Sequence, residues 1–362
     1  MAGLSLAAAV LLAGGTVCLT SGCSTVGYLA QSVNGHLALV RSAKPVPEWL
    51  ADPATPTALK QRLELSQRIR DFAATELAEP DNASYRRYAD LHRSNAVWNV
   101  VAAPELSLQL TTWCFPVVGC VGYRGYYDEA DAQAFAATLR AQGLEVSVYG
   151  VPAYSTLGKL PAAEWLADPL LNTFIDYPEG ELARLIFHEL AHQVAFAPGD
   201  TLFNESFAST VEKIGAQRWL AENAAAAARV EYELAEARRA DFRALTSRYR
   251  DELARLYASA QADDVKRAEK AAILARLRAD YAAMKATRWN GYAGYDTWFA
   301  QANNAAFGVL ASYTGLVPAF ERLFEREGRD FPRFYAEVRR LAALPSRDRQ
   351  AALAAAATSS PP

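Results

Sequence analysis

Apolar and polar positions follow two rhythms along this chain, one typical of helices and one typical of strands. Apolar residues recur at helical spacing in 58–77, 130–142 and 181–196, which contain no Pro or Gly. Between the first two of these, Val, Tyr and Trp are separated by Gly and Pro turns, which predicts strands over 96–127. The stretch 144–154 predicts one more strand. The pattern therefore indicates an α+β fold.

A long charged region, 217–286, is rich in Ala, Arg and Glu and has a break near 261–264. We expect it to form two long antiparallel helices that pack against each other. A solvated helical hairpin is the simplest interpretation, and a surface for a protein partner is the alternative.

The predicted organisation has six parts. They are a leader over 1–22, an N-terminal helical segment over 23–95, a sheet-containing core over 96–216, the helical hairpin over 217–287, a C-terminal helical part over 288–350 and a tail over 351–362. The tail is expected to be disordered, as chain ends often are.

The N-terminus carries a targeting signal. Residues 3–19 form an apolar run of the length of a secretory signal, and the small residues before Cys23 are typical of a lipobox. Cleavage would leave Cys23 as a lipidated terminus. No Lys or Arg precedes the run, and Thr20 replaces the usual aliphatic residue, so an uncleaved anchor is the alternative. In both cases the protein is exported and tethered to a membrane, which we expect to be the outer membrane.

Composition and net charge limit the classes of function that are possible. The 362 residues suffice for a sizeable core, and a net charge of −3 provides no basic surface for nucleic acid. Outside the leader the sequence has two Cys, Cys114 and Cys120. In an exported protein this pair suggests a disulfide that closes a strand–turn–strand segment. Two extra metal ligands are the alternative, but their spacing matches no familiar site.

Two of the four histidines fall in one HExxH pentapeptide. His188 and His192 are four residues apart in a helical run, so they share one face and can bind the same Zn²⁺. Glu189, one step round the helix, can reach a water on that metal. The other two, His36 and His92, have no neighbour at ligand spacing.

A chance HExxH match on an ordinary amphipathic helix is the alternative. The flanking residues Leu185, Ile186 and Val194 are apolar, so both histidines should be largely buried. Buried polar groups require partners, which favours the zinc interpretation.

A second motif, NESFASTVE, follows HELAHQ in the sequence. Together they resemble the zinc site of the alanyl-aminopeptidases (aminopeptidase N-like metallopeptidases), whose segments read HELAHQ and NEGFA. The resemblance implies that Glu205 is the third ligand and that one position stays open for water. Twelve residues separate His192 from Glu205, fewer than in that family, so the connection must be tighter.

Glu212 is the alternative third ligand. It lies seven residues after Glu205, about two helical turns, so both can face the HExxH helix. Spacing from His192 favours Glu212, whereas the local sequence favours Glu205. We expect Glu205 to bind the metal and Glu212 to lie behind, accepting a ring N–H from His188 or His192.

Further stretches resemble bacterial lipoproteins that are described as predicted zinc aminopeptidases. They are PDNASYRRYADL, WNVVAAPELSL, WCFPVVGCVGYRGYYDE, GVPAYSTLG and DPLLNTF. This resemblance implies a zincin-like core, in which a small mixed sheet lies beside the HExxH helix. It also implies one Zn²⁺ and hydrolysis of peptides.

The resemblance assigns further roles. Glu189 would be the general base. Tyr154, Ser155 and Thr156 would form a sheet edge that pairs with substrate backbone, and an ordinary loop is the alternative. A tyrosine hydroxyl would stabilise the oxyanion, with Tyr313 the first candidate by position and Tyr154 the second.

Three functions remain open. The first is a zinc aminopeptidase acting on exported peptides. The second is a zinc endopeptidase acting on envelope proteins, because nothing resembles the GAMEN loop that binds the free amine, and Glu105 is only a candidate for that role. The third is a lipoprotein scaffold with structural zinc, against which the intact Glu189 argues.

Overall fold

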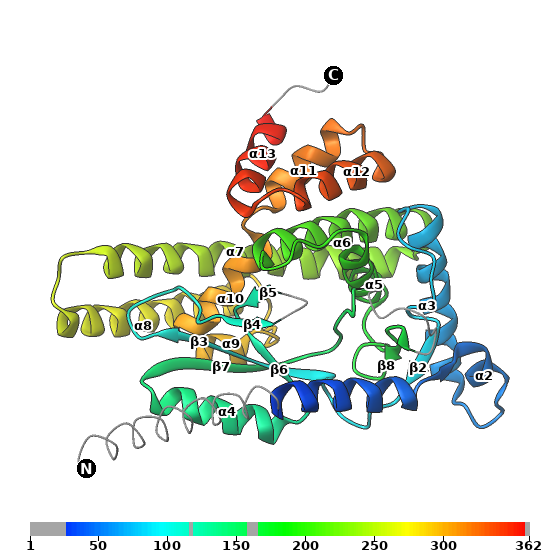
Figure 1. Cartoon of the computed structure of the whole chain (residues 1–362), viewed down its shortest axis with the longest axis horizontal. Helices are drawn as coiled ribbons and strands as arrows, with labels where there is room; N and C mark the ends of the chain where they lie inside the picture. Colours follow the sequence, from blue (N-terminus) through cyan, green and yellow to red (C-terminus); the bar gives the residue numbers. More distant parts are fainter. Residues whose placement is uncertain (1–26, 116–118, 158–165, 359–362) are drawn as a thin grey trace, which may run out of the picture.

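The computed structural model describes residues 27–115, 119–157 and 166–358 of the 362-residue chain. Helices predominate, with three small sheets among them, so the predicted α+β class is confirmed (Figure 1). The predicted leader, with Cys23, lies outside the described residues. The described chain begins with a helix over 27–42.

The main sheet is antiparallel and has β3 at its centre. Its strands, in order, are β6 (Arg124–Tyr126), β3 (Val97–Pro104) and β7 (Leu144–Val151). Seven of the eight residues of β3 are buried. Trp98, Val100 and Ala102 join an apolar cluster with α4 (Glu129–Ala141), while Val101 and Ala103 contact α10 (Asn304–Thr314). Because both faces are covered, the strand has a nearly continuous apolar sequence.

The other two sheets consist of very short strands. β1 (Lys44–Pro45), β2 (Arg87–Ala89) and β8 (Leu170–Leu171) form one, and β4 (Trp113–Phe115) pairs with β5 (Gly119–Val121) in the other. A disulfide joins Cys114 to Cys120, which face each other across β4 and β5. The first of these sheets has no counterpart in the sequence prediction, because strands of two or three residues show no periodicity.

Two adjacent helices, α5 (Glu179–Val194) and α6 (Thr201–Asn223), form the main apolar core together with α3 (Thr57–Thr75). Gly215 of α6 packs against Phe187 of α5 and against Leu77, which follows α3. A Cβ atom placed there would lie 2.7 Å from Cδ1 of Leu77 and 2.8 Å from Cδ2 of Phe187. The absence of a side chain at Gly215 therefore allows α6 to pack tightly against the helix that carries HExxH.

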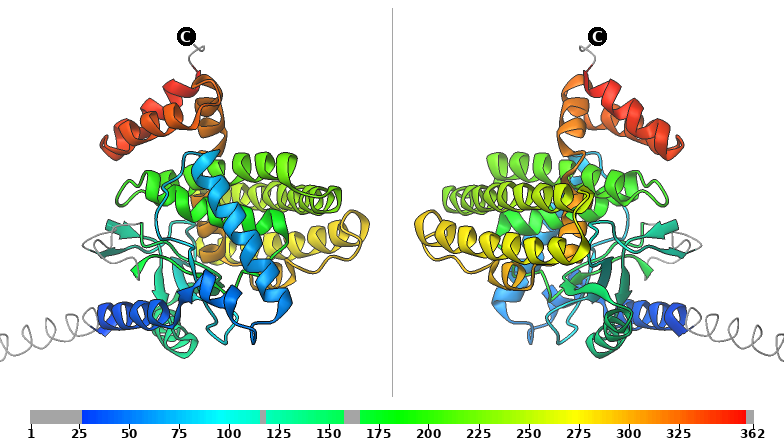
Figure 2. Two further views of the ribbon diagram at one scale, coloured as in Figure 1. Left: turned by 90° about the vertical axis from the view of Figure 1, so that its right-hand side faces the viewer. Right: turned by 90° about the vertical axis from the view of Figure 1, so that its left-hand side faces the viewer.

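Two long helices, α7 (Ala226–Ala258) and α8 (Asp263–Thr287), extend away from this core (Figures 1 and 2). Ion pairs between Arg248 and Asp280 and between Arg276 and Glu252 link them. They bury a separate apolar cluster with α9 (Asp296–Gln301), in which Phe299 stacks on a tyrosine of α8.

The C-terminal helices correct one prediction. The described chain ends with three helices, α11 (Val317–Arg326), α12 (Phe331–Ala342) and α13 (Ser346–Thr358). One further short helix, α2 (Val46–Ala51), lies near the start. The tail predicted to be disordered from residue 351 is therefore helical as far as 358. Its Ala-rich sequence has a high helix propensity. Leu353 is fully buried and Arg349 pairs with Asp200, so the helix is docked on the core.

Among the described helices, none has both the length and the apolar character that crossing a membrane requires.

Replacing Gly215 by Ala should lower the free energy of unfolding by about 1–3 kcal/mol, because the added methyl group overpacks the contact between α5 and α6. Urea unfolding measures this effect. Gly27→Ala is the matched control, since Gly27 is also helical and a Cβ there meets nothing within 4 Å. Equal stability changes in the two variants would contradict the tight contact.

Candidate metal centre

Two side chains, Asn204 and Asp200, hold the connection between α5 and α6. Asn204 accepts a hydrogen bond from the backbone N–H of Ala197 at 2.8 Å and donates one to the carbonyl of Ala197 at 2.9 Å. Asp200 caps α6 by accepting from the N–H of Phe203. Asn204 is 2% exposed, so water does not compete for these bonds. The short connection is thereby fixed, and the next residue, Glu205, faces α5.

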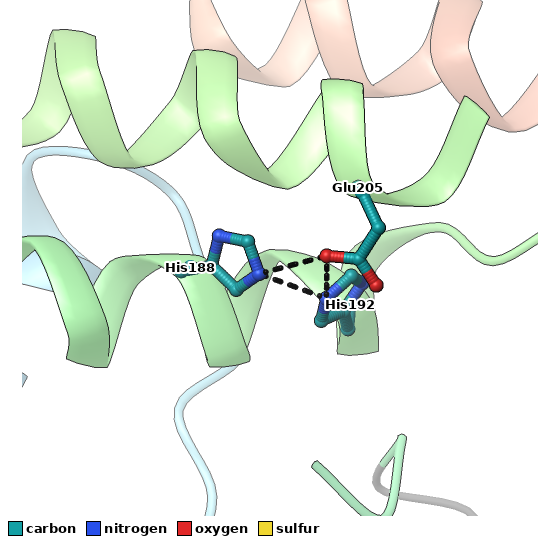
Figure 3. Close-up of side chains that lie close together, drawn as sticks. All are labelled: His188, His192 and Glu205. Carbon is teal, nitrogen blue, oxygen red and sulfur yellow. Dashed lines mark hydrogen bonds and ion pairs between the residues drawn. The ribbon is translucent and has the colours of Figure 1, made fainter. Parts of the chain in front are cut away.

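Three side chains from α5 and α6 converge (Figure 3). The Nε2 atoms of His188 and His192 lie 3.2 Å apart. One carboxylate oxygen of Glu205 lies 3.3 Å from Nε2 of His188 and 3.8 Å from Nε2 of His192. All three donor atoms fall within 4.8 Å of one another. Two imidazoles and one carboxylate are the donor set of catalytic zinc sites, so these residues fit a single metal ion.

Glu212 lies behind His188. Its carboxylate is 3.0 Å from Nδ1 of His188. It also pairs with Arg184, whose guanidinium reaches Glu236 at 3.1 Å. An acidic partner on the second ring nitrogen fixes the tautomer in which Nε2 is free to bind a metal. Because Glu212 approaches Nδ1 of His188 whereas Glu205 approaches Nε2 of both histidines, Glu205 rather than Glu212 completes the candidate metal-binding group.

The charges of the group suit metal binding. Burial alone would lower the pKa of His188, but hydrogen bonds and charges from Glu205 and Glu212 raise it well above its usual value. Burial lowers the pKa of His192 to about 4. Burial would raise the pKa of Glu205, but the two imidazoles outweigh it and hold that pKa below its usual value. A neutral His192 and an ionised Glu205 are the forms that coordinate a metal, and a metal ion at the Nε2 atom of His188 would displace the proton that the two carboxylates attract to that ring.

Glu189 lies beside the metal-binding face and lines the same cleft. Burial raises its pKa to about 7; His188 opposes this shift, while the carboxylates of Glu205 and Asp168 add to it. A carboxyl group with a pKa near 7 can both accept and donate a proton near neutral pH.

A cleft of about 400 Å³ opens onto Glu189 and the three metal-binding side chains. Its walls come from the helix over 27–42, from β3, β5, β6 and the end of β7, and from the segment that follows β7. The cleft therefore lies between the main sheet and the pair α5 and α6, where a substrate could reach both.

Tyr154, Ser155 and Thr156, predicted to form a sheet edge, lie in the loop after β7, which ends at Val151, so the alternative of an ordinary loop is the one that the structure shows. Tyr154 and Ser155 line the cleft, and the hydroxyl of Tyr154 is 2.7 Å from Nδ1 of His36. The N–H of Thr156 lies 3.1 Å from both carboxylate oxygens of Asp168. Asp168 is 2% exposed, and its buried carboxylate therefore anchors the segment that contains Thr156.

Other candidates lie elsewhere. Tyr313 belongs to α10, but its side chain lies outside the described part of the structure. Glu105 does not line the cleft; its carboxylate pairs with Arg267 of α8 at 2.8 Å. His92 is exposed and lies 3.4 Å from Asp90.

The structure adds Tyr123, which has no signal in the sequence beyond being one of 17 tyrosines. It lies between β5 and β6 and lines the cleft. Tyr123 is 37% exposed, and partial burial in the cleft raises the pKa of its hydroxyl, with a further contribution from Glu205. Tyr123 therefore shares the cleft with both carboxylates of the centre.

Comparison with protein families matches residues 27–353 to the family described as "Putative aminopeptidase". The chain belongs to this family. The match includes α5, α6 and every described wall of the cleft, so membership supports a peptidase at the level of reaction class. No curated protein and no solved structure matches the chain.

The two glutamates should differ in their effect on metal affinity. Glu205→Ala should abolish zinc binding, because it removes a ligand, whereas Glu212→Ala should weaken it by roughly 10–100-fold, because it frees the ring of His188. Competition with a chelator gives the affinities. Glu236→Ala is the matched control, since Glu236 also pairs with Arg184 but contacts neither histidine in the contacts described. If Glu212→Ala is the more damaging variant, the two roles must be exchanged.

Proposed function

We propose that this protein is a zinc-dependent peptidase, and that it acts as an aminopeptidase on exported peptides. The observation that supports this most directly is the convergence of His188, His192 and Glu205 at a cleft that also holds Glu189. The family match supports the reaction class. In this proposal the sheets beside α5 form a zincin-like core, and α7 and α8 form a helical hairpin attached to it.

His188, His192 and Glu205 would hold the ion, and Glu212 would keep the ring of His188 in its binding tautomer. Bound zinc lowers the pKa of a coordinated water to about 7 and polarises a carbonyl group. A structural zinc site would have no need of Glu189 or of an open cleft, which argues against a scaffold.

Glu189 would transfer the protons of the reaction. Its carboxylate accepts a proton from the attacking water and then donates that proton to the leaving amine. Burial has already made its two protonation states nearly equal in energy near neutral pH, since its pKa is about 7. The same side chain can therefore act first as base and then as acid.

Tyr123 is our candidate for the donor to the developing oxyanion. Tyr123 lines the same cleft as Glu205 and Glu189, and its raised pKa keeps its hydroxyl protonated. The hydroxyl of Tyr154 is already engaged by His36 and is less available.

An endopeptidase is the second candidate. Among the described residues that line the cleft, the carboxylates are Glu189 and Glu205, and both are assigned to catalysis. A free amine at the substrate's N-terminus therefore has no further carboxylate to bind among these residues. A substrate that lacks a free amine would lose no contact with them.

We also propose that the protein is an exported lipoprotein, anchored through Cys23 to the periplasmic face of the outer membrane. The sequence before Cys23 supports this. Membrane association should disappear in a Cys23→Ser variant, and its persistence would favour an uncleaved anchor.

Glu189→Gln should abolish hydrolysis and leave zinc bound, because Glu189 is assigned as base and not as ligand. Activity on a peptide panel and metal content would be measured on the same preparation. Loss of zinc together with activity would show that Glu189 has a different role.

Tyr123→Phe should lower kcat by about 100-fold with little change in KM, as expected when an oxyanion donor is removed. Tyr154→Phe is the matched control, because Tyr154 lines the same cleft but its hydroxyl is engaged by His36. An equal loss in the control, with no loss in Tyr123→Phe, would assign the role to Tyr154.

If the protein is an aminopeptidase, a peptide with a free amine should be cleaved at least about 10-fold faster than its N-acetylated form. The acetylated peptide would leave the protein group that binds the amine without a partner, which gives a penalty of this size. Comparison of kcat/KM for the pair measures this. Equal rates would favour the endopeptidase.

A further inference from the structure

The cleft beside the metal-binding residues has an uncharged lining. Six of its described lining residues are aromatic, and five more are Val, Leu or Ala. The aromatic residues are Tyr28, Phe115, Tyr123, Tyr127, Tyr154 and Phe196. They come from the helix over 27–42, from β4, from the connections that flank β6 and follow β7, and from the loop after α5, so several separate segments contribute rings to the cleft.

Charged groups in the described lining are confined to the centre itself. They are His188, Glu189, His192 and Glu205, and this part of the lining contains no Lys, Arg or Asp. Two guanidinium groups contact lining residues without lining the cleft themselves: that of Arg124 stacks on the ring of Tyr28 at 4.0 Å, and that of Arg93 donates to the backbone carbonyl of Tyr127. Among the described lining residues, a charged substrate side chain would therefore find no partner of opposite charge that is not already used by the centre.

This lining favours some substrate side chains over others according to their charge and apolar area. A charged side chain that enters the cleft loses water without gaining a counter-ion. An acidic side chain also meets the carboxylate of Glu189. An aromatic or large aliphatic side chain instead buries apolar area and contacts rings, both of which are favourable.

We propose that the cleft selects peptides whose residues flanking the scissile bond are aromatic or large aliphatic, and that it discriminates against charged residues there. This inference rests on the proposed peptidase function. It adds a substrate class that the centre alone does not define, because the centre contacts the peptide bond and the walls contact the side chains.

Three Gly-rich peptides test it with the zinc-loaded protein. They are identical except that the two residues flanking the cleavable bond are both Phe, both Asp or both Lys. The Phe peptide should have a kcat/KM at least about 10-fold above each of the others, since a hydrophobic pocket discriminates on this scale. Mass spectrometry of the products identifies the bond that is cut.

The outcomes separate the inference from the function on which it rests. Cleavage that depends on Glu189, with Asp or Lys peptides cut as fast as the Phe peptide, overturns the side-chain selectivity alone. Absence of cleavage of every peptide, or cleavage that survives Glu189→Gln, overturns both.

A charge placed in the wall gives an independent readout. Ser32 lines the cleft on the helix over 27–42 and is half-buried, so Ser32→Lys adds a cation there. It should reduce the Phe-to-Asp ratio of kcat/KM by at least about 3-fold through attraction to the acidic side chain. Asn34→Lys is the matched control, because Asn34 is exposed on the same helix and does not line this cleft. An unchanged ratio in Ser32→Lys, or an equal change in both variants, contradicts the assignment of this wall to substrate side chains.

Discussion

One carboxylate oxygen of Glu205, placed within 4 Å of two imidazole nitrogens, is the contact on which the proposed chemistry depends. Burying a carboxylate and two imidazoles in a protein core is unfavourable unless their charges are compensated. Glu212 and Arg184 compensate part of it from behind, at Nδ1 of His188. The Nδ1 atom of His192 has no hydrogen-bond partner among the described residues. A bound cation would supply the remaining compensation at the Nε2 side.

The rest of the fold keeps this contact in place and gives it access to solvent. Asn204 fixes the short connection, and Gly215 allows α6 to lie close to α5. The antiparallel sheet stands opposite the helix pair and supplies the walls of the cleft. Asp168 holds the segment after β7 near Glu189. The packing of the core, the shape of the cleft and the charges around the centre therefore all depend on the same few side chains of α5 and α6.

Sequence patterns predicted the long elements well, because helices such as α3, α4 and α5 carry a clear apolar rhythm and the strand β3 is rich in Val and Trp between turn residues. HExxH and the NESFA motif named residues that the structure brings together, since ligand spacing on one helix is a local property. The positions of Tyr123 at the cleft and of Asp168 against the segment after β7 could not be predicted, because both come only from tertiary contacts. The helical end of the chain at α13 was missed for a similar reason, as burial of Leu353 and pairing of Arg349 are long-range contacts.

X-ray absorption at the zinc edge, on protein loaded with one equivalent of zinc, tests the central claim most directly. Two imidazole nitrogens at about 2.0–2.1 Å and carboxylate and water oxygens are expected around the ion. His192→Ala should remove one imidazole from that shell. Sulfur neighbours at about 2.3 Å would instead place the ion at Cys114 and Cys120 and contradict the assignment, as would a shell that His192→Ala leaves unchanged.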